Sequence, residues 1–299
     1  MDRELWGLIR SVIRRADRHV CRTCGPEKKV QVSSTQVVAM HLWQVYHDRT
    51  LSWACQRSSY GGVFRPRKLL SISQYSRRVK SPRVQRLLTY MQQAVSRADG
   101  PVRLSYFDGK LLPVAMHSKD RQATKVRTNH GYVRGYRLHA WATDRGFLPV
   151  WSVTGAHEGE QTVARRLCPH LPPMAADALV LGDVRFDSAK LYADVAVTGA
   201  TRLTPLQAIS QVPRKRQAMG PARRAAVEAW EQTPAFVRQI LHERGAIERI
   251  FGTLSGTAGG LGPLPAWVRG LDRVRRWVGI KVILYNARLR LRHARKRAA

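Results

Sequence analysis

Three acidic residues, far apart in the chain, stand where a folded sheet can gather them. Asp108 follows residues 103–107, a run with aromatic side chains that predicts a strand. Asp183 ends an aliphatic run at residues 178–182, and Glu248 lies in a later segment with helical spacing. Ligand sites of open α/β sheets form at the ends of strands. We therefore expect Asp108, Asp183 and Glu248 to meet in one anionic pocket.

Such a pocket favours divalent cations. Carboxylates held close together resist ionisation, and a bound cation relieves their repulsion. Hard oxygen ligands suit Mg²⁺, with Mn²⁺ as a substitute, whereas no group of His and Cys residues has the spacing of a zinc site. The single CxxC pair, Cys21 and Cys24, is too isolated to predict one. Two divalent ions roughly 4 Å apart support the displacement of one phosphodiester oxygen by another.

Asp187 is the alternative to Asp183 as the second acid of this pocket. It stands at the start of a predicted helix at residues 187–197, where aspartate commonly accepts a hydrogen bond as the N-cap. We therefore expect Asp187 to cap that helix and Asp183 to serve the pocket.

The charge of the chain indicates a polyanionic partner. Lysine and arginine total 52 against 20 acidic residues, which gives a net charge of +32 and a pI near 11.4. Nucleic acids, ribosomes and acidic membranes all relieve such an excess. No apolar run has the length of a membrane span, and the first residues lack a signal-peptide pattern. We expect a cytoplasmic, nucleoid-associated protein that does not insert into a membrane.

Residues 1–100 predict an all-α domain with a helix-turn-helix-like DNA-binding region. Helical spacing runs through residues 1–17, a loop follows around Cys21, and a second helix begins at Ser34. Further on, Ser73 is expected to cap a short helix and Pro82 to begin the next. The cations expected to contact DNA here are Arg77, Arg78 and Lys80. The alternative is a small helical bundle whose basic face is only solvated.

Residues 101–299 change to alternating strands and helices, which predicts a mixed α/β domain. Residues 103–107 and 111–115 are expected to form a hairpin around a turn at Gly109-Lys110. The other expected elements are strands at 135–143, 148–154, 178–182 and 200–206, helices at 158–171 and 187–197, a basic insertion at about 207–235, a helical region at 236–254, a loop at 256–265, and a basic C-terminal helix from 267.

At these acids the sequence resembles the DDE transposases of bacterial insertion sequences, which have a ribonuclease-H-like catalytic domain. The resemblance covers most of residues 104–290, with the motifs in the family's order. The motifs are Tyr106-Phe107-Asp108-Gly109-Lys110, His117-Ser118-Lys119-Asp120, Gly135-Tyr136-Arg137-Leu138-His139, Gly182-Asp183-Val184-Arg185-Phe186-Asp187-Ser188, Arg244-x-x-x-Glu248-Arg249-x-Phe251 and residues 278–286.

The resemblance implies a ribonuclease-H-like mixed sheet flanked by helices. It assigns catalysis and metal binding to Asp108, Asp183 and Glu248. The implied reaction is metal-dependent cleavage of double-stranded DNA at transposon ends, followed by attack of the released 3′ hydroxyl on target DNA. Pairing of two ends implies a homodimer on DNA.

Four further cations are expected to contact DNA in this domain: Arg134, Arg137, Arg244 and Arg249. Arg244 lies one helical turn before Glu248, so it either holds a phosphate or pairs with that glutamate. The sequence departs from the pattern of many members at Leu241, where they carry tyrosine, and at Ser255, where they carry a basic residue. These departures imply that contacts to the DNA backbone are rearranged or supplied by Arg249.

Three other functions stay open at this point. The first is a transposase-derived DNA-binding protein without catalysis, and the second is a nuclease of the same fold that cuts and never joins. The third is an RNA-binding protein, although none of the aromatic stacking motifs of the known RNA modules is present.

Overall fold

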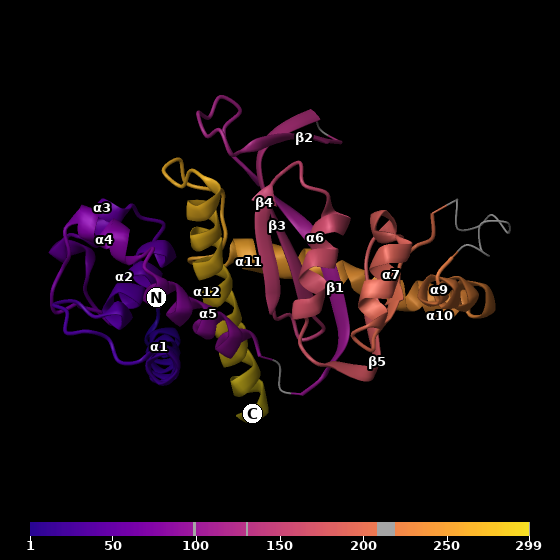
Figure 1. Ribbon diagram of the computed structural model, residues 1–299, viewed down its shortest axis with the longest axis horizontal. Helices are drawn as coiled ribbons and strands as arrows, with labels where there is room; N and C mark the ends of the chain where they lie inside the picture. The colour runs from indigo at the N-terminus through magenta and orange to yellow at the C-terminus, as the bar shows by residue number, and fades with distance from the viewer. Residues whose placement is uncertain (98–99, 130, 208–218, 299) are drawn as a thin grey trace. The chain divides into compact units, whose positions relative to one another are not determined.

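The computed structural model describes residues 1–97, 100–129, 131–207 and 219–298 (Figure 1). Its tertiary contacts form two compact units. The helical unit comprises Met1–Ser96, Leu254–Val268 and Arg276–Ala299, and the sheet unit comprises Arg97–Thr253 and Arg269–Arg275. The basic C-terminal segment thus groups with the N-terminal helices. The division of the chain at residue 100 stays a prediction.

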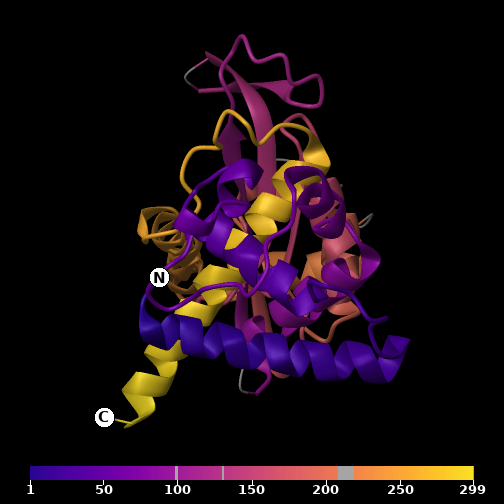
Figure 2. The same ribbon diagram turned by 90° about the vertical axis from the view of Figure 1, so that its left-hand side faces the viewer.

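The helical unit is built on one long helix. α1 spans Arg3–Cys24 and buries one face, so it continues through the loop that the sequence predicted around Cys21 (Figure 2). Gly25, with φ of 76°, ends it. The remaining helices are α2 (Ser34–Tyr46), α3 (Leu51–Ala54), α4 (Ile72–Arg78), α5 (Pro82–Ser96) and most of α12 (Leu271–Ala298). The predicted starts at Ser34 and Pro82 are confirmed.

The predicted cap of α4 is wrong by two residues. Ser71, not Ser73, accepts a hydrogen bond from the Gln74 amide, and the Gln74 side chain accepts one from the Ser71 amide. Two serines compete for this position. Ser71 is selected because Gln74 lies three residues after it, and the two residues then satisfy each other's backbone amides.

α12 lies where the sequence predicted the basic C-terminal helix, but it begins at Leu271 and not at residue 267. Its predicted apolar face is buried, with Trp277, Ile280, Ile283 and Leu284 all at most 3% exposed. Lys281 is also buried and donates a hydrogen bond of 2.7 Å to Asp48 within the helical unit.

The sheet unit carries a six-stranded mixed sheet in the order β2-β3-β1-β5-β6, with β4 also paired to β3. β1 pairs with β3 in antiparallel fashion, and β5 lies parallel to both β1 and β6. An antiparallel half joined to a parallel half is the expected ribonuclease-H-like arrangement. The strands are β1 (Val102–Pro113), β2 (Thr124–Thr128), β3 (Gly131–Thr143), β4 (Val150–Gly155), β5 (Met174–Leu181) and β6 (Thr201–Leu203).

The predicted hairpin around Gly109-Lys110 is wrong, because β1 is continuous. It pairs with β3 from Ser105 opposite Thr143 to Pro113 opposite Gly135, so the backbone at Gly109 is already part of a ladder. The glycine serves a close approach instead of a turn. A Cβ atom there would lie 2.6 Å from Oε1 of Glu160.

Two helices cover one face of this sheet side by side (Figure 1). α6 (Glu160–Leu167) contributes Val163 and Leu167, and α7 (Ala189–Ala196) contributes Leu191, to a core around Phe107 and Trp141. α6 is shorter than predicted because a 3₁₀ turn at Cys168–His170 follows it. Side chains alternate along a strand. Asp108 therefore points away from this core while its neighbour Phe107 points into it.

The helical region predicted at 236–254 consists of α10 (Pro234–His242), a 3₁₀ turn at Glu243–Gly245 and α11 (Ala246–Gly256). Of the basic insertion predicted at 207–235, residues 208–218 lie outside the described residues, and α9 (Pro221–Gln232) forms much of the rest. No helix in the described ranges has the length and hydropathy needed to cross a membrane.

Candidate active site

The pairing of β1 and β5 brings Asp108 and Asp183 to the same place in the sheet. Tyr106 lies opposite Leu181 in the parallel ladder; Asp108 follows two residues later within β1, and Asp183 follows two residues after Leu181, just beyond the end of β5. Neighbouring strands run roughly 4.8 Å apart. β5 ends at Leu181 while β1 continues, so Asp108 stands at an open edge with Asp183 beside it.

The surroundings of Asp108 disfavour its charged form. Burial raises the pKa of this carboxyl to about 6, and the negative charges of Glu160 and Asp183 act in the same direction. The Gly109 amide, which donates a 2.7 Å hydrogen bond to Oδ1, and the charge of Arg244 oppose the shift. The net result is that the neutral form of Asp108 is favoured more than in water.

Asp183 begins a 3₁₀ turn at Val184–Phe186. Its Oδ1 accepts a 2.8 Å hydrogen bond from the Arg185 amide, which fixes the side chain at the end of β5. Hard oxygen donors of this kind are what Mg²⁺ and Mn²⁺ bind. Asp108 and Asp183 therefore fit a divalent cation in their donor chemistry.

Glu248 stands apart from the two aspartates. Its side chain is 69% exposed on α11, and Oε1 lies 4.0 Å from Nη2 of Arg244, one helical turn earlier. In the described parts of the chain, no three acidic, His or Cys residues come close enough to hold a metal ion together. The link between the glutamate and the pair is Arg244, which contacts Glu248 and lowers the pKa of Asp108 through its charge.

Asp187 has other partners than the sequence predicted. It is not the N-cap of α7, because Ser188 occupies that position. Asp187 is buried instead, with Oδ1 2.9 Å from Nε of Arg223 and Oδ2 accepting a 2.9 Å hydrogen bond from the Gln207 amide. The cap expectation is wrong because a buried ion pair holds this side chain. Both of its oxygens are therefore engaged within the fold.

Glu160 is a residue of the site that sequence analysis missed. It opens α6 and forms a 2.6 Å ion pair with Arg137, in which the two side chains are 14% and 15% exposed. Burial raises the pKa of Glu160, and the negative charge of Asp183 adds to that shift. The only signal in the sequence was Gly109 directly after Asp108, since a glycine inside a strand marks close approach of another group.

Arg202 is a second missed residue, on β6 behind Asp183. Its guanidinium lies over the rings of Phe186 and Tyr192, 5.8 and 5.7 Å from their centroids. In the part of the chain that the structure describes, its three nitrogens have no hydrogen-bond partner, and burial lowers its pKa to about 10. A Cβ atom on Gly182 would lie 2.6 Å from Nη2, so glycine is required there too.

The cations expected to contact DNA fall into two groups. Three have internal partners: Arg78 pairs with Glu27 at 3.1 Å, Arg134 donates to the carbonyls of three residues of the 118–123 segment, and Arg137 pairs with Glu160. The other four are the exposed Arg77, Lys80 and Arg249 and the half-buried Arg244, which lies 4.0 Å from Glu248. The second group is better placed for a phosphate.

Residues 103–287 match the family model of the transposase DDE domain, which spans more than half of the chain. A comparison with curated proteins gives no match.

Proposed function

Since the chain belongs to the family of transposases with a DDE domain, we propose that Asp108, Asp183 and Glu248 hold the divalent metal ions on which its catalysis depends. The enzyme is a DNA transposase, which cleaves strands and transfers them by phosphoryl transfer. The observation that carries the assignment is the β1–β5 register, which sets Asp108 and Asp183 side by side.

The chain's own residues prepare the site for a cation. The Gly109 amide holds Oδ1 of Asp108, and the Arg185 amide holds Oδ1 of Asp183, so both carboxylates are oriented before anything binds. The charge of Arg244 lowers the pKa of Asp108, and its Nη2 lies 4.0 Å from Oε1 of Glu248. Bound divalent ions supply activation of an attacking oxygen and stabilisation of the leaving one. We assign Mg²⁺ to this role, with Mn²⁺ as a substitute, on the oxygen-only ligand set.

The substrate that we propose is double-stranded DNA, as transposon ends and as target, bound by a homodimer. Of the seven cations predicted to contact DNA, the exposed Arg77, Lys80 and Arg249 are the ones that contact the DNA backbone. Arg244 is the cation that reaches the phosphate nearest the acids, because it lies beside both Asp108 and Glu248.

The test replaces Asp108 by Asn. Asp108→Asn loses cleavage of end-containing DNA with Mg²⁺ by at least about a hundredfold, because the amide no longer supplies a negative oxygen ligand. DNA binding in EDTA stays as in the wild type. Asp177→Asn is the matched control. Asp177 is an exposed residue of β5, six positions before Asp183 and away from the end of the strand that Asp183 follows.

Thermal unfolding gives a readout that does not depend on activity. Mg²⁺ or Mn²⁺ raises the Tm of the wild type and of Asp177→Asn, because a ligand that binds only the folded state stabilises it. The ions leave the Tm of Asp108→Asn unchanged. Cleavage by Asp108→Asn, or an equal Tm shift in all three proteins, contradicts the assignment. Strand-transfer products on a target plasmid separate the transposase from a nuclease of the same fold.

A further inference from the structure

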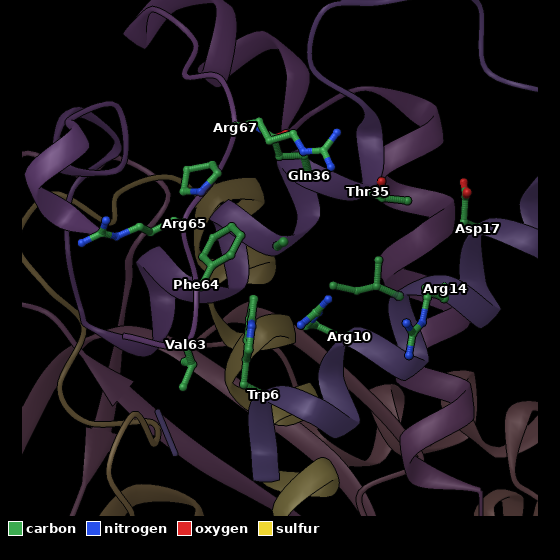
Figure 3. A pocket seen from close by; sticks show the side chains of 13 residues that line it. Trp6, Arg10, Arg14, Asp17, Thr35, Gln36, Val63, Phe64, Arg65 and Arg67 are labelled. Carbon is green, nitrogen blue, oxygen red and sulfur yellow. The ribbon is translucent and has the colours of Figure 1, made fainter. Parts of the chain in front are cut away.

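The helical unit contains a basic pocket of about 450 Å³ (Figure 3). One wall is the face of α1 that carries Arg10 and Arg14, and the opposite wall is the segment that carries Arg65 and Arg67. Figure 3 shows Arg10, Arg14 and Arg67 around the same hollow as Phe64 and Trp6, while the Arg65 side chain extends outward from its wall. We call these four arginines the arginine pocket.

The arginine pocket is a concentration of uncompensated charge. All four side chains are exposed, and Arg10 and Arg14 are one helical turn apart on α1. In the described residues no hydrogen bond or ion pair engages their guanidinium groups. The single acid in the lining, Asp17, lies 3.7 Å from Arg83 and so has a cation of its own. Like charges held together in this way attract an anion.

The pocket is already formed in the folded chain. Arg57 donates to the backbone carbonyls of Pro66 and Arg67, which pins the second wall from behind. The Gln36 side chain donates a 2.5 Å hydrogen bond to the Lys68 carbonyl and ties the same segment to α2. Phe64 packs against Trp6 with ring centroids 4.7 Å apart. Arginines on fixed walls lose little freedom when they bind, which favours affinity.

The chemistry of the walls selects a phosphate backbone over a base. Guanidinium groups match phosphate oxygens with two parallel hydrogen bonds. Trp6 is only 3% exposed and Phe64 is half-buried against it, so the exposed part of the lining is mainly arginine and not aromatic. Contacts of this kind position a protein on nucleic acid without reading its sequence.

We propose that the arginine pocket binds the phosphate backbone of duplex DNA. The identity of this partner rests on the proposed function, whereas the preference for a polyphosphate rests on the pocket itself. The pocket is distinct from the predicted contacts on α4, where Arg78 is engaged by Glu27.

The test measures DNA affinity of the full chain in EDTA, so that no cleavage occurs. The pocket variant carries Arg10→Gln, Arg14→Gln, Arg65→Gln and Arg67→Gln. The control variant carries Arg3→Gln, Arg15→Gln, Arg18→Gln and Arg22→Gln, four exposed arginines of α1 outside the pocket lining. Both variants lose the same charge. Circular dichroism and Tm verify that both are folded, and Arg65→Gln with Arg67→Gln alone serves if α1 is disturbed.

Each phosphate contact contributes about 0.9 to the slope of log K against log salt. The pocket variant loses about 2 to 4 from this slope and at least about tenfold in affinity at moderate salt, equally on end-containing and shuffled duplexes. The control variant loses less than 1 from the slope. Equal losses in both variants mean that only net charge matters and overturn the proposal, as does wild-type binding by the pocket variant.

Two further arms identify other occupants. A loss of binding to single-stranded RNA or to anionic vesicles, with duplex DNA binding unchanged, assigns the pocket to those partners and contradicts duplex DNA. Failure here is separable from failure of the metal site, because Asp108→Asn is judged by cleavage and Mg²⁺ response while the pocket variant is judged by affinity without metal.

Discussion

Gly109, the residue after Asp108, has no side chain, and this allows Glu160 to approach β1. The Glu160 carboxylate occupies the space that a Cβ on Gly109 would fill, and Arg137 holds it there at 2.6 Å. Two effects compete at Glu160. The ion pair with Arg137 favours its charged form, whereas burial and the charge of Asp183 oppose it. The pKa of Glu160 is raised, so the opposing effects are the larger.

Glu160→Gln therefore stabilises the metal-free protein at pH 7. An acid whose pKa is raised on folding contributes stability below its unfolded pKa and loses it as the pH rises through its folded pKa. At pH 7 the charge of Glu160 is a cost, and its removal raises the free energy of unfolding. Urea unfolding checks this gain at pH 7. The same measurement at pH 4 shows no gain, because Glu160 is then largely protonated in both states.

Glu158→Gln is the control for that experiment, because it removes the same charge from a surface ion pair with Arg166. Such pairs contribute little, so the control changes stability by less than about 0.5 kcal/mol. A fall in stability of Glu160→Gln beyond the control would show that the pair with Arg137 is the stronger effect.

His41 makes the helical unit sensitive to acid. It is 5% exposed, and its Nδ1 lies 3.1 Å from Oε1 of Gln44. Burial lowers its pKa to about 4, and the charge of Arg276 adds to the shift while the Gln44 hydrogen bond opposes it. The unfolded chain then binds a proton that the fold excludes. Stability is full above about pH 6.5 and falls toward pH 4 by up to about 1.4 kcal/mol per pH unit.

His41→Gln lessens this pH dependence between 6.5 and 4, whatever it does to stability at neutral pH, and the part that remains includes His139, whose pKa burial lowers to about 3. The measurement is the urea midpoint and slope of the wild type and the variant at several pH values in that window. An unchanged slope in the variant would place the responsible proton on another group.

The capping box of α4 shows how one element chooses its first residue. Ser71→Ala removes the hydroxyl that accepts from the Gln74 amide, and it costs about 1 kcal/mol of stability. Ser73→Ala, two residues on in the first turn, changes stability by less than about 0.5 kcal/mol. Equilibrium denaturation of both variants decides between the two caps. Equal losses of stability in Ser71→Ala and Ser73→Ala would contradict the assignment of Ser71 as the N-cap.

β1 shows what can be predicted about elements from this sequence and what cannot. The alternation of residues 103–107 predicts a strand, because it reflects burial on one face. The wrong turn at Gly109 arose because a glycine has the same appearance in a turn and in a strand with a crowded face. What decides is Glu160, 51 positions later, and only the folded sheet brings it there.

The site was predictable to the same extent. Asp108 and Asp183 were identifiable from their positions at strand ends, since strand order in a mixed sheet brings such ends together. Glu160, Arg202 and the internal partners of Arg134 were not, because each depends on side-chain contacts between elements. Glu248 was located on its helix, but the spacing carries no information on its distance from the aspartates.

The pairing of β1 and β3 depends on Gly135. A Cβ atom there would lie 2.2 Å from the carbonyl oxygen of Leu112, and backbone cannot move aside as a side chain can. Gly135→Ala therefore costs at least about 2 kcal/mol. Gly252→Ala, in α11 with nothing within 4 Å, adds about 0.5 to 1 kcal/mol. Denaturation curves of both check the contrast, and a neutral Gly135→Ala would show that the strands slide apart at little cost.

For the whole molecule, the dominant quantity is the net charge of +32. Charges of one sign repel in any compact state, and screening them stabilises the fold. The Debye length falls from about 30 Å at 0.01 M salt to about 8 Å at 0.15 M. Added NaCl therefore stabilises the free protein while it weakens binding to DNA, which depends on the same charges.

The Tm of the free protein accordingly rises by about 2 to 6 °C between 0.01 and 0.15 M NaCl, since about 1 kcal/mol moves the Tm of a protein of this size by a few degrees. KCl gives the same rise, whereas sulfate is avoided because it stabilises proteins by exclusion from their surface. The variant with Arg3, Arg15, Arg18 and Arg22 replaced by Gln has a smaller rise, because it starts with four fewer positive charges. Differential scanning calorimetry measures both proteins. A Tm that stays constant or falls with NaCl would mean that specific ion pairs outweigh the general repulsion.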